Sequence, residues 1–344
     1  MNKLVKYFRI IVVVILSFLL IIFPKDIAES AVLGIENCIN IIIPSMFAFM
    51  VISTYIMSSN IYEIIFTPLF VIFNHIIRLN KSLFSVFCLS LIGGYPIGIK
   101  LLKELIAQNK NYSEISAVMS GFCYCISPTF AITMIGLGLY GNAEVGLIIY
   151  ISNVIACIIM AIIQSHRNNL KVSDINISKK GGIIYSINSS ANALYKICSI
   201  IIIFNIMLTA IESLLLVFQA KIPIIIKSFI EISNVVNLSN PNMASLPIIS
   251  ALSSTGGLCV LFQSYSLIGD DFSPTVFLIS RLPCALISYL TTIIMLLFWD
   301  ISIPAFSENQ NYMFELNTNR IILVLVLIMC VILLQKNEKN LKKG

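Results

Sequence analysis

Long apolar runs, separated by short polar and charged segments, make up most of this chain. A helix that crosses a membrane needs about 20 consecutive, mostly apolar residues. Runs of this kind predict spans at about 10–23, 31–58, 113–139, 143–164, 193–218, 274–299 and 321–334. The pattern therefore predicts an all-α polytopic membrane protein with about eight transmembrane helices.

Two further apolar segments are short or interrupted. Residues 61–77 contain Glu63 and Pro68 and predict a helix at the membrane interface. Residues 222–236 fit two readings. If they lie at the interface, the lysine-rich C-terminal tail falls outside, against the positive-inside rule. If they cross, the tail is inside, but the two halves of the chain are no longer strictly inverted copies.

Two apolar segments carry a break in the middle. In residues 82–106 the break is Gly93, Gly94, Tyr95 and Pro96, which stops a helix because glycine frees the backbone and proline removes a donor. The arm before it, about nine residues, covers less than half of a ~30 Å hydrocarbon core. We therefore predict a re-entrant helical hairpin, and a second one at 245–268, where Gly256-Gly257 takes the place of Gly93-Gly94.

The paired breaks organise the chain into two related repeats within one membrane domain, 1–344. The first repeat is predicted at 31–164 and the second at 190–299, joined by a cytosolic loop at 165–182 and followed by a last span and basic tail at 320–344. Irregular backbone at membrane depth is tolerated only against protein or a wet cavity. Repeats that each carry a broken helix are typical of transporters, with the binding site at the breaks.

Composition and charge support the membrane assignment. The chain is 58% hydrophobic and 11% charged, whereas a soluble domain carries about 25% charged residues. The lysines lie in loops without interleaved aromatics, so the net charge of +6 sets topology and indicates no nucleic acid. The nine cysteines lie mostly singly in apolar runs and are interpreted as packing residues. No metal, nucleotide or hydrolase motif occurs, so we expect no enzyme and no cofactor.

Arg281 is the sharpest candidate for binding chemistry, because it lies about two turns inside a predicted span. A guanidinium matches a carboxylate with two parallel bonds, which predicts an anion clamp. The alternative is a structural ion pair with Glu231 or Glu212. Lys100 follows the first break by one turn and is expected mainly to extend towards the membrane surface.

Other polar groups lie at the predicted hairpin tips or within spans. Tips expose backbone amides and hydroxyls to a negative group, while Asn153 and Gln263 either bind solute or join helices. The residues predicted to contact the solute are Gly93, Gly94, Tyr95, Pro96, Lys100, Ser127, Pro128, Thr129, Asn153, Glu231, Asn234, Ser253, Ser254, Thr255, Gly256, Gly257, Gln263 and Arg281.

Three segments, GGYPIGIK at 93–100, FIEIS at 229–233 and GGLCVLFQ at 256–263, resemble the YlbJ family of sporulation integral membrane proteins. The resemblance covers about 44–294. It implies a gate, or nucleoside-recognition, domain distantly shared with concentrative nucleoside transporters, and dipicolinate transport across the outer forespore membrane. The chain departs from the family where Tyr124, Cys125 and Ser127-Pro128 replace asparagines before a Gly-Pro, and where the usual glycine after Glu231 is missing.

The sequence thus predicts a bacterial integral membrane transporter for a small anionic solute, with dipicolinate implied by the resemblance. Its partners are the solute and membrane lipid, and a coupling ion is left unidentified. One alternative is a nucleoside transporter. Another is a non-transporting sporulation partner, for which only the polar segments 165–182 and 300–319 offer a docking surface.

Overall fold

The computed structural model describes residues 3–108, 112–168, 170, 181–239, 241–299 and 301. Within these residues all regular elements are helical, and five stretches are long and apolar enough to cross a membrane: Pro24–Ser58, Ala143–Arg167, Ile183–Val217, Met243–Ile268 and Pro274–Phe298. The chain is therefore a helical membrane protein. The predicted last span and tail at 320–344, and most of the predicted loop at 165–182, lie outside the described residues.

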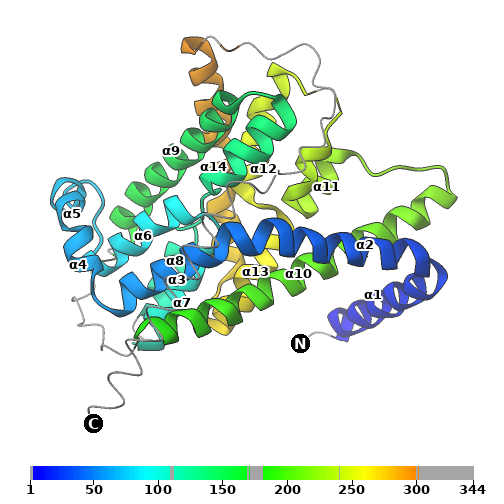
Figure 1. Ribbon diagram of the computed structural model, residues 1–344, viewed down its shortest axis with the longest axis horizontal. Coiled ribbons are helices and arrows are strands. Elements are labelled where there is room, and N and C mark those ends of the chain that lie inside the picture. Colours follow the sequence, from blue (N-terminus) through cyan, green and yellow to red (C-terminus); the bar gives the residue numbers. More distant parts are fainter. Residues whose placement is uncertain are drawn as a thin grey trace. The chain divides into compact units, whose positions relative to one another are not determined.

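Two long helical stretches lie along one another (Figure 1). The first runs through α2 (Pro24–Asn37), the π-helical turn η1 (Cys38–Ile42) and α3 (Ile43–Ser58), after α1 (Lys3–Ile22). The second is α10 (Ile183–Val217), which begins ten residues before the predicted start of its span. At 1.5 Å per residue, 35 residues extend well beyond a ~30 Å hydrocarbon core. Both stretches therefore reach past the membrane interior.

The segment after α3 forms two short helices, α4 (Tyr62–Ile65) and α5 (Thr67–Phe73), with Pro68 in the first turn of α5. Neither is long enough to cross a membrane. The first predicted hairpin then forms α6 (Lys81–Gly93) and α7 (Ile97–Gln108), whose arms pack against one another. Asn80 caps α6, since its side-chain oxygen accepts a 2.9 Å bond from the Leu83 amide.

The predicted continuous helix at 113–139 is wrong. The structure has α8 (Tyr112–Met119), a non-helical segment at 120–127 and a π-helix η2 (Phe130–Leu139). Pro128 explains why the helix restarts only there, because proline lacks an N–H and pushes the preceding Ser127 away from helical angles. α9 (Ala143–Arg167) follows, capped by Asn142. The chain thus contains a third interrupted helix that the periodicity of the sequence did not reveal.

The predicted segment 222–236 also breaks, at Glu231, into α11 (Ile224–Ile230) and the 3-10 helix η3 (Ile232–Asn237). The short η4 (Met243–Ser245) leads into α12 (Leu246–Thr255), which is followed by α13 (Gly257–Ile268), η5 (Gly269–Asp271) and α14 (Pro274–Phe298). α14 agrees with the span predicted at 274–299 to within one residue.

The second predicted hairpin, 245–268, departs from hairpin geometry. α12 packs mainly on α9 and α14, whereas α13 packs on α7, α10 and α11, and the two arms share little contact. Figure 1 shows α12 and α13 at different levels of the bundle. The whole of Met243–Ile268 is long enough to cross a membrane. In the structure this element is therefore an interrupted span, because its arms find different neighbours instead of each other.

Candidate functional site

Three helix interruptions meet at one buried point, which we call the tip junction and define by Gly94, Tyr95, Tyr124, Gly256 and Arg281. The Tyr95 amide donates a 2.7 Å bond to the Cys125 carbonyl, joining the α6–α7 break to the segment at 120–127. The approach is close, since a methyl group added to Gly94 would lie 2.6 Å from the backbone nitrogen of Ser127. Gly94 also has φ +78°, a conformation that favours glycine.

Tyr124 connects all three interruptions. Its ring stacks on the Tyr95 ring with centroids 4.8 Å apart. On its other side, a methyl group added to Gly256 would lie 2.8 Å from Tyr124 Cζ. Gly256 ends α12 in the left-handed conformation, with φ +70°. The Gly-Gly sequence at this break is thus required by both backbone conformation and space.

Arg281 is buried on α14 and serves the same junction. Its Nη1 donates to the carbonyls of Tyr124, at 2.9 Å, and Ser254, at 3.3 Å. Its Cζ lies 5.0 Å from the centre of the Tyr124 ring. Carbonyls released by helix breaks need such partners because lipid offers none. Arg281 therefore holds two of the interrupted segments together.

The ion pair of Arg281 with Glu231 or Glu212, which was the alternative to an anion clamp, does not form. In the described part of the chain the ion pairs are Lys100–Glu104 and Lys227–Glu212. Arg281 uses carbonyl oxygens and the Cys284 sulfur instead. Its positive charge is therefore not cancelled by a carboxylate within the described residues.

Five buried polar atoms around the junction have no hydrogen-bond partner among the described residues. They are the hydroxyl oxygens of Tyr95, Tyr124, Ser253 and Ser254, and the Arg281 Nε. All five can donate a proton, and leaving such a group unpaired costs about 1–3 kcal/mol each. The junction is therefore rich in free donors, which suits an acceptor such as a carboxylate.

The remaining predicted tip residues mainly support the backbone. Gly93 is buried, and Ser127 accepts a 3.2 Å bond from the Phe130 amide at the start of η2, beside Pro128 and Thr129. Thr255 donates to the Leu252 carbonyl at 2.7 Å within α12. These residues therefore shape the helix breaks. Pro96, between α6 and α7, has the same role.

Two polar residues within helices, Asn153 and Gln263, bond to protein groups. Asn153 on α9 donates to the Ile149 carbonyl at 2.9 Å and to the Ser250 carbonyl of α12 at 3.3 Å. Gln263 is buried and donates to the Cys259 sulfur, one turn earlier in α13. Asn153 therefore joins α9 to α12, whereas the bond of Gln263 stays within its own helix.

Lys100 is buried, at 3% exposure, so the expectation that it extends to the membrane surface is wrong. It donates to the Thr54 hydroxyl and lies 3.8 Å from Glu104 Oε1. Packing of α7 against α3 closes off the route to the surface, because it covers the side chain.

A polar cavity of about 350 Å³ lies between α2–η1, η2, α10 and η3, and we call it the acidic cavity. Two of the residues predicted to contact the solute, Glu231 and Asn234, line it. The other polar lining residues were not among the predicted site residues and are Ser30, Asn37, Asn205, Thr209, Glu212, Ser233 and Asn237. The cavity borders the second break, because a methyl group added to Gly257 would lie 3.3 Å from the Ile230 carbonyl. Glu231 thus stands close to the tip junction.

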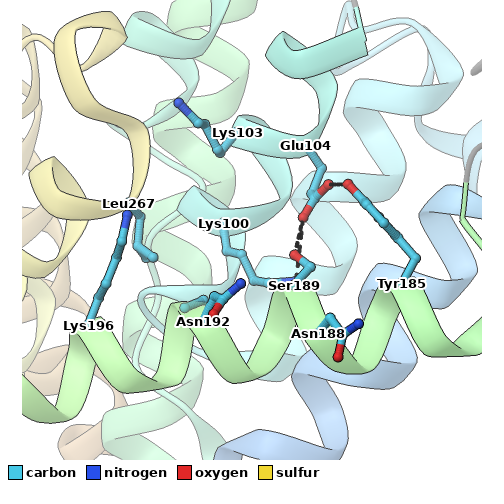
Figure 2. Close-up of a pocket in the computed structure, with 10 residues that line it drawn as sticks. Lys100, Lys103, Glu104, Tyr185, Asn188, Ser189, Asn192, Lys196 and Leu267 are labelled. Carbon is cyan, nitrogen blue, oxygen red and sulfur yellow. Dashed lines mark hydrogen bonds and ion pairs between the residues drawn. The ribbon is translucent and has the colours of Figure 1, made fainter.

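A second pocket, of about 390 Å³, lies between α7, α10 and the end of α13 (Figure 2). Lys100, Lys103 and Lys196 line this lysine pocket together with a single carboxylate, Glu104. Lys103 donates to the Ile268 carbonyl at 2.9 Å and Lys196 to the Ser266 carbonyl at 3.1 Å, while Glu104 accepts bonds from α10. Three cations against one anion make the lining positive.

Comparisons with protein-family models, curated proteins and solved structures give no match for this chain. The site residues that sequence reasoning missed therefore come from the geometry of the chain itself. Asn205 carried a usable signal, since it stands alone in the apolar run IIIIFNIML. Tyr124 and Lys196 carried none, because their roles depend on segments distant in sequence.

Proposed function

We propose that this protein is a membrane transporter that moves a small anionic solute. The observation that supports this proposal is the tip junction, where three interrupted helices bring unpaired donors together inside a bundle of membrane-length helices. Broken helices near the centre of a membrane protein are typical transport sites. A carboxylate would accept bonds from the hydroxyls of Tyr95, Tyr124 and Ser254 and from Arg281 Nε.

The lysine pocket has a separate role in this proposal. Its positive lining attracts anions and raises their local concentration beside α7, the second arm of the first break. Lys103 and Lys196 already donate hydrogen bonds to carbonyls at the end of α13. A carboxylate in the pocket would have to replace these bonds, so it would bind there weakly. The pocket therefore concentrates the solute, while the junction binds it.

The proposed transport cycle is alternating access. The elements α6–α7 and α12–α13 move against the remaining helices and expose the junction to one side at a time. We include in the proposal an architecture of about eight spans in two related repeats, with a re-entrant hairpin at 82–106 in the first repeat and the interrupted element Met243–Ile268 in the second. We also include membership of the YlbJ family, with dipicolinate as solute and the outer forespore membrane as location, on the strength of the motifs at 93–100, 229–233 and 256–263.

A nucleoside transporter is the second candidate, and the acidic cavity favours it. Glu231 and the amides of Asn205 and Asn234 can bond hydroxyls and a base edge, as a neutral polar solute requires. A non-transporting partner protein is the third candidate. It does not explain why the junction contains unpaired buried donors.

Uptake into lipid vesicles distinguishes these candidates. The purified full chain is reconstituted, and labelled dipicolinate and labelled uridine are offered separately, with protein-free vesicles as control. Our proposal expects dipicolinate uptake that unlabelled dipicolinate inhibits and uridine does not. Uptake of uridine alone would establish the second candidate, and uptake of neither would contradict the assigned transport of these solutes.

A further inference from the structure

Glu231 is a buried acid without a cation. Its exposed fraction is 4%, and it takes no part in either ion pair of the described residues, Lys100–Glu104 and Lys227–Glu212. A charge buried inside a membrane protein is costly unless a partner neutralises it. The described residues supply no such cation, so binding of a proton is the simplest way to remove the charge.

The hydrogen bonds of Glu231 leave one oxygen available. Oε2 accepts from the Ser233 amide at 3.0 Å, from the Ser233 hydroxyl and, at 3.5 Å, from Asn234 Nδ2. No donor within the described residues bonds Oε1. Because Glu231 lines the acidic cavity, which is polar and large enough to hold water, a proton can reach this oxygen through the cavity.

The groups that face Glu231 from neighbouring elements supply no positive charge. Glu212 on α10 lines the same cavity, but Lys227 on α11 already pairs with it. The groups in electrostatic contact with Glu231 are Cys38 of η1, Tyr95 beside α6 and Cys259 of α13, which carry either no charge or a negative one. The residues of η2 that line the cavity, Phe130 and Met134, do not titrate.

We propose that Glu231 binds the proton that drives transport, so that one proton crosses with each solute molecule. The inference rests on the proposed function and adds the coupling ion to it. An ionised Glu231, next to the second break, repels an anion at the tip junction. When Oε1 takes up a proton, the repulsion disappears and the solute binds. After the elements move, loss of the proton on the other side repels the solute and promotes its release.

Infrared spectroscopy tests the proton site without any solute. The full chain in lipid nanodiscs is titrated while the carbonyl stretch of protonated carboxylic acids is recorded. We expect a buried-acid band that is lost as pH rises and is absent from Glu231→Gln. It should persist in Glu212→Gln and return, shifted, in Glu231→Asp. An unchanged band in Glu231→Gln, or no band in the wild type, would overturn the proposal.

Vesicle transport tests the coupling. In Glu231→Gln the amide oxygen can keep the bonds from Ser233, so the fold should be retained. We expect this variant to exchange internal for external dipicolinate at a rate independent of pH, and to lose accumulation driven by an imposed pH gradient. Gradient-driven accumulation by Glu231→Gln would overturn the coupling. If the wild type moves no dipicolinate, the proposed function fails, while the infrared titration still decides whether Glu231 holds a proton.

Discussion

The Tyr124 ring fills the position that a side chain at Gly256 would need. A methyl group on Gly256 would lie 2.8 Å from Tyr124 Cζ, closer than real side chains pack, and the backbone of Gly256 has φ +70°. The end of α12 therefore closes directly over the tyrosine that links the other two helix breaks. This contact makes the junction a tightly packed unit in which bulk and backbone conformation are both constrained.

Gly256→Ala is expected to destabilise the protein. A left-handed residue with a side chain costs roughly 1–2 kcal/mol, and overpacking adds about 1–3 kcal/mol. The free energy of unfolding in detergent should therefore fall by about 2–5 kcal/mol. Gly182→Ala is the control, since a methyl group there meets nothing within 4 Å. Equal stability of the two variants would contradict the packing described at Gly256.

Arg281→Lys should lower stability and yield. An ammonium replaces the planar fork with a single point charge, so it cannot bond both the Tyr124 and the Ser254 carbonyls in the same geometry. Each hydrogen bond to a charged group is worth roughly 1.5–3 kcal/mol, which sets the size of the expected loss. Thermal unfolding of the purified variant measures it. A variant as stable as the wild type would show that these carbonyls do not depend on Arg281.

The double variant Arg281→Gln with Glu231→Gln tests whether the charges of the two residues stabilise one another. Because no ion pair joins the two residues, Glu231→Gln should change stability by the same amount in the wild type and in Arg281→Gln. A larger gain in Arg281→Gln than in the wild type would instead demonstrate coupling between the two charges.

Ser254→Ala should separate binding from folding. The Ser254 hydroxyl is buried and unpaired within the described residues, so its removal leaves stability unchanged or slightly higher. If the solute carboxylate accepts from it, affinity should fall about tenfold or more, since a bond to a charged group is worth roughly 1.5–3 kcal/mol. Equilibrium binding of labelled dipicolinate measures this. Thr255→Val is a matched control, because the Thr255 hydroxyl already bonds the Leu252 carbonyl. Unchanged affinity in Ser254→Ala would remove this hydroxyl from the solute site.

The double variant Lys103→Gln with Lys196→Gln should slow the uptake of an anion. The lysine pocket keeps only Lys100 against Glu104, so its attraction for anions weakens. We expect a several-fold lower initial rate at low ionic strength and a smaller difference at high salt, where charges are screened. Lys25→Gln is the control, because exposed Lys25 lies on α2 and does not line this pocket. A salt-independent effect would argue against electrostatic attraction.

Asn205→Cys should react with a charged thiol reagent in a cysteine-free background. Asn205 lines the acidic cavity, where water can ionise the thiol, whereas Ile203 on the same helix is 53% exposed on an apolar face. We therefore expect labelling of Asn205→Cys and none of Ile203→Cys in lipid vesicles. Reagent applied to one side at a time reports the side to which the cavity opens. An unlabelled Asn205→Cys would show that the cavity does not stay wet, and labelling of Ile203→Cys would show that its face is not covered by lipid.

The sequence alone determined the membrane-length helices α9 and α14 and the breaks at Gly93–Pro96 and Gly256–Gly257. Both follow from local properties: apolar runs drive helices into lipid, and glycine or proline interrupts them wherever the chain folds. The ends of α9 and α14 were predictable for the same reason, since polar residues flank them.

Only the tertiary structure decided which groups meet. Arg281 bonds carbonyls at Tyr124 and Ser254 instead of a glutamate, and Lys100 is buried under α3 instead of reaching the surface. The lining of the acidic cavity likewise comes from segments far apart in the sequence, with Ser30 at one end and Asn237 at the other. A buried charge bonds to the groups that the packed helices bring within bonding distance. These groups can lie more than a hundred residues away in the sequence, so no local pattern predicts them.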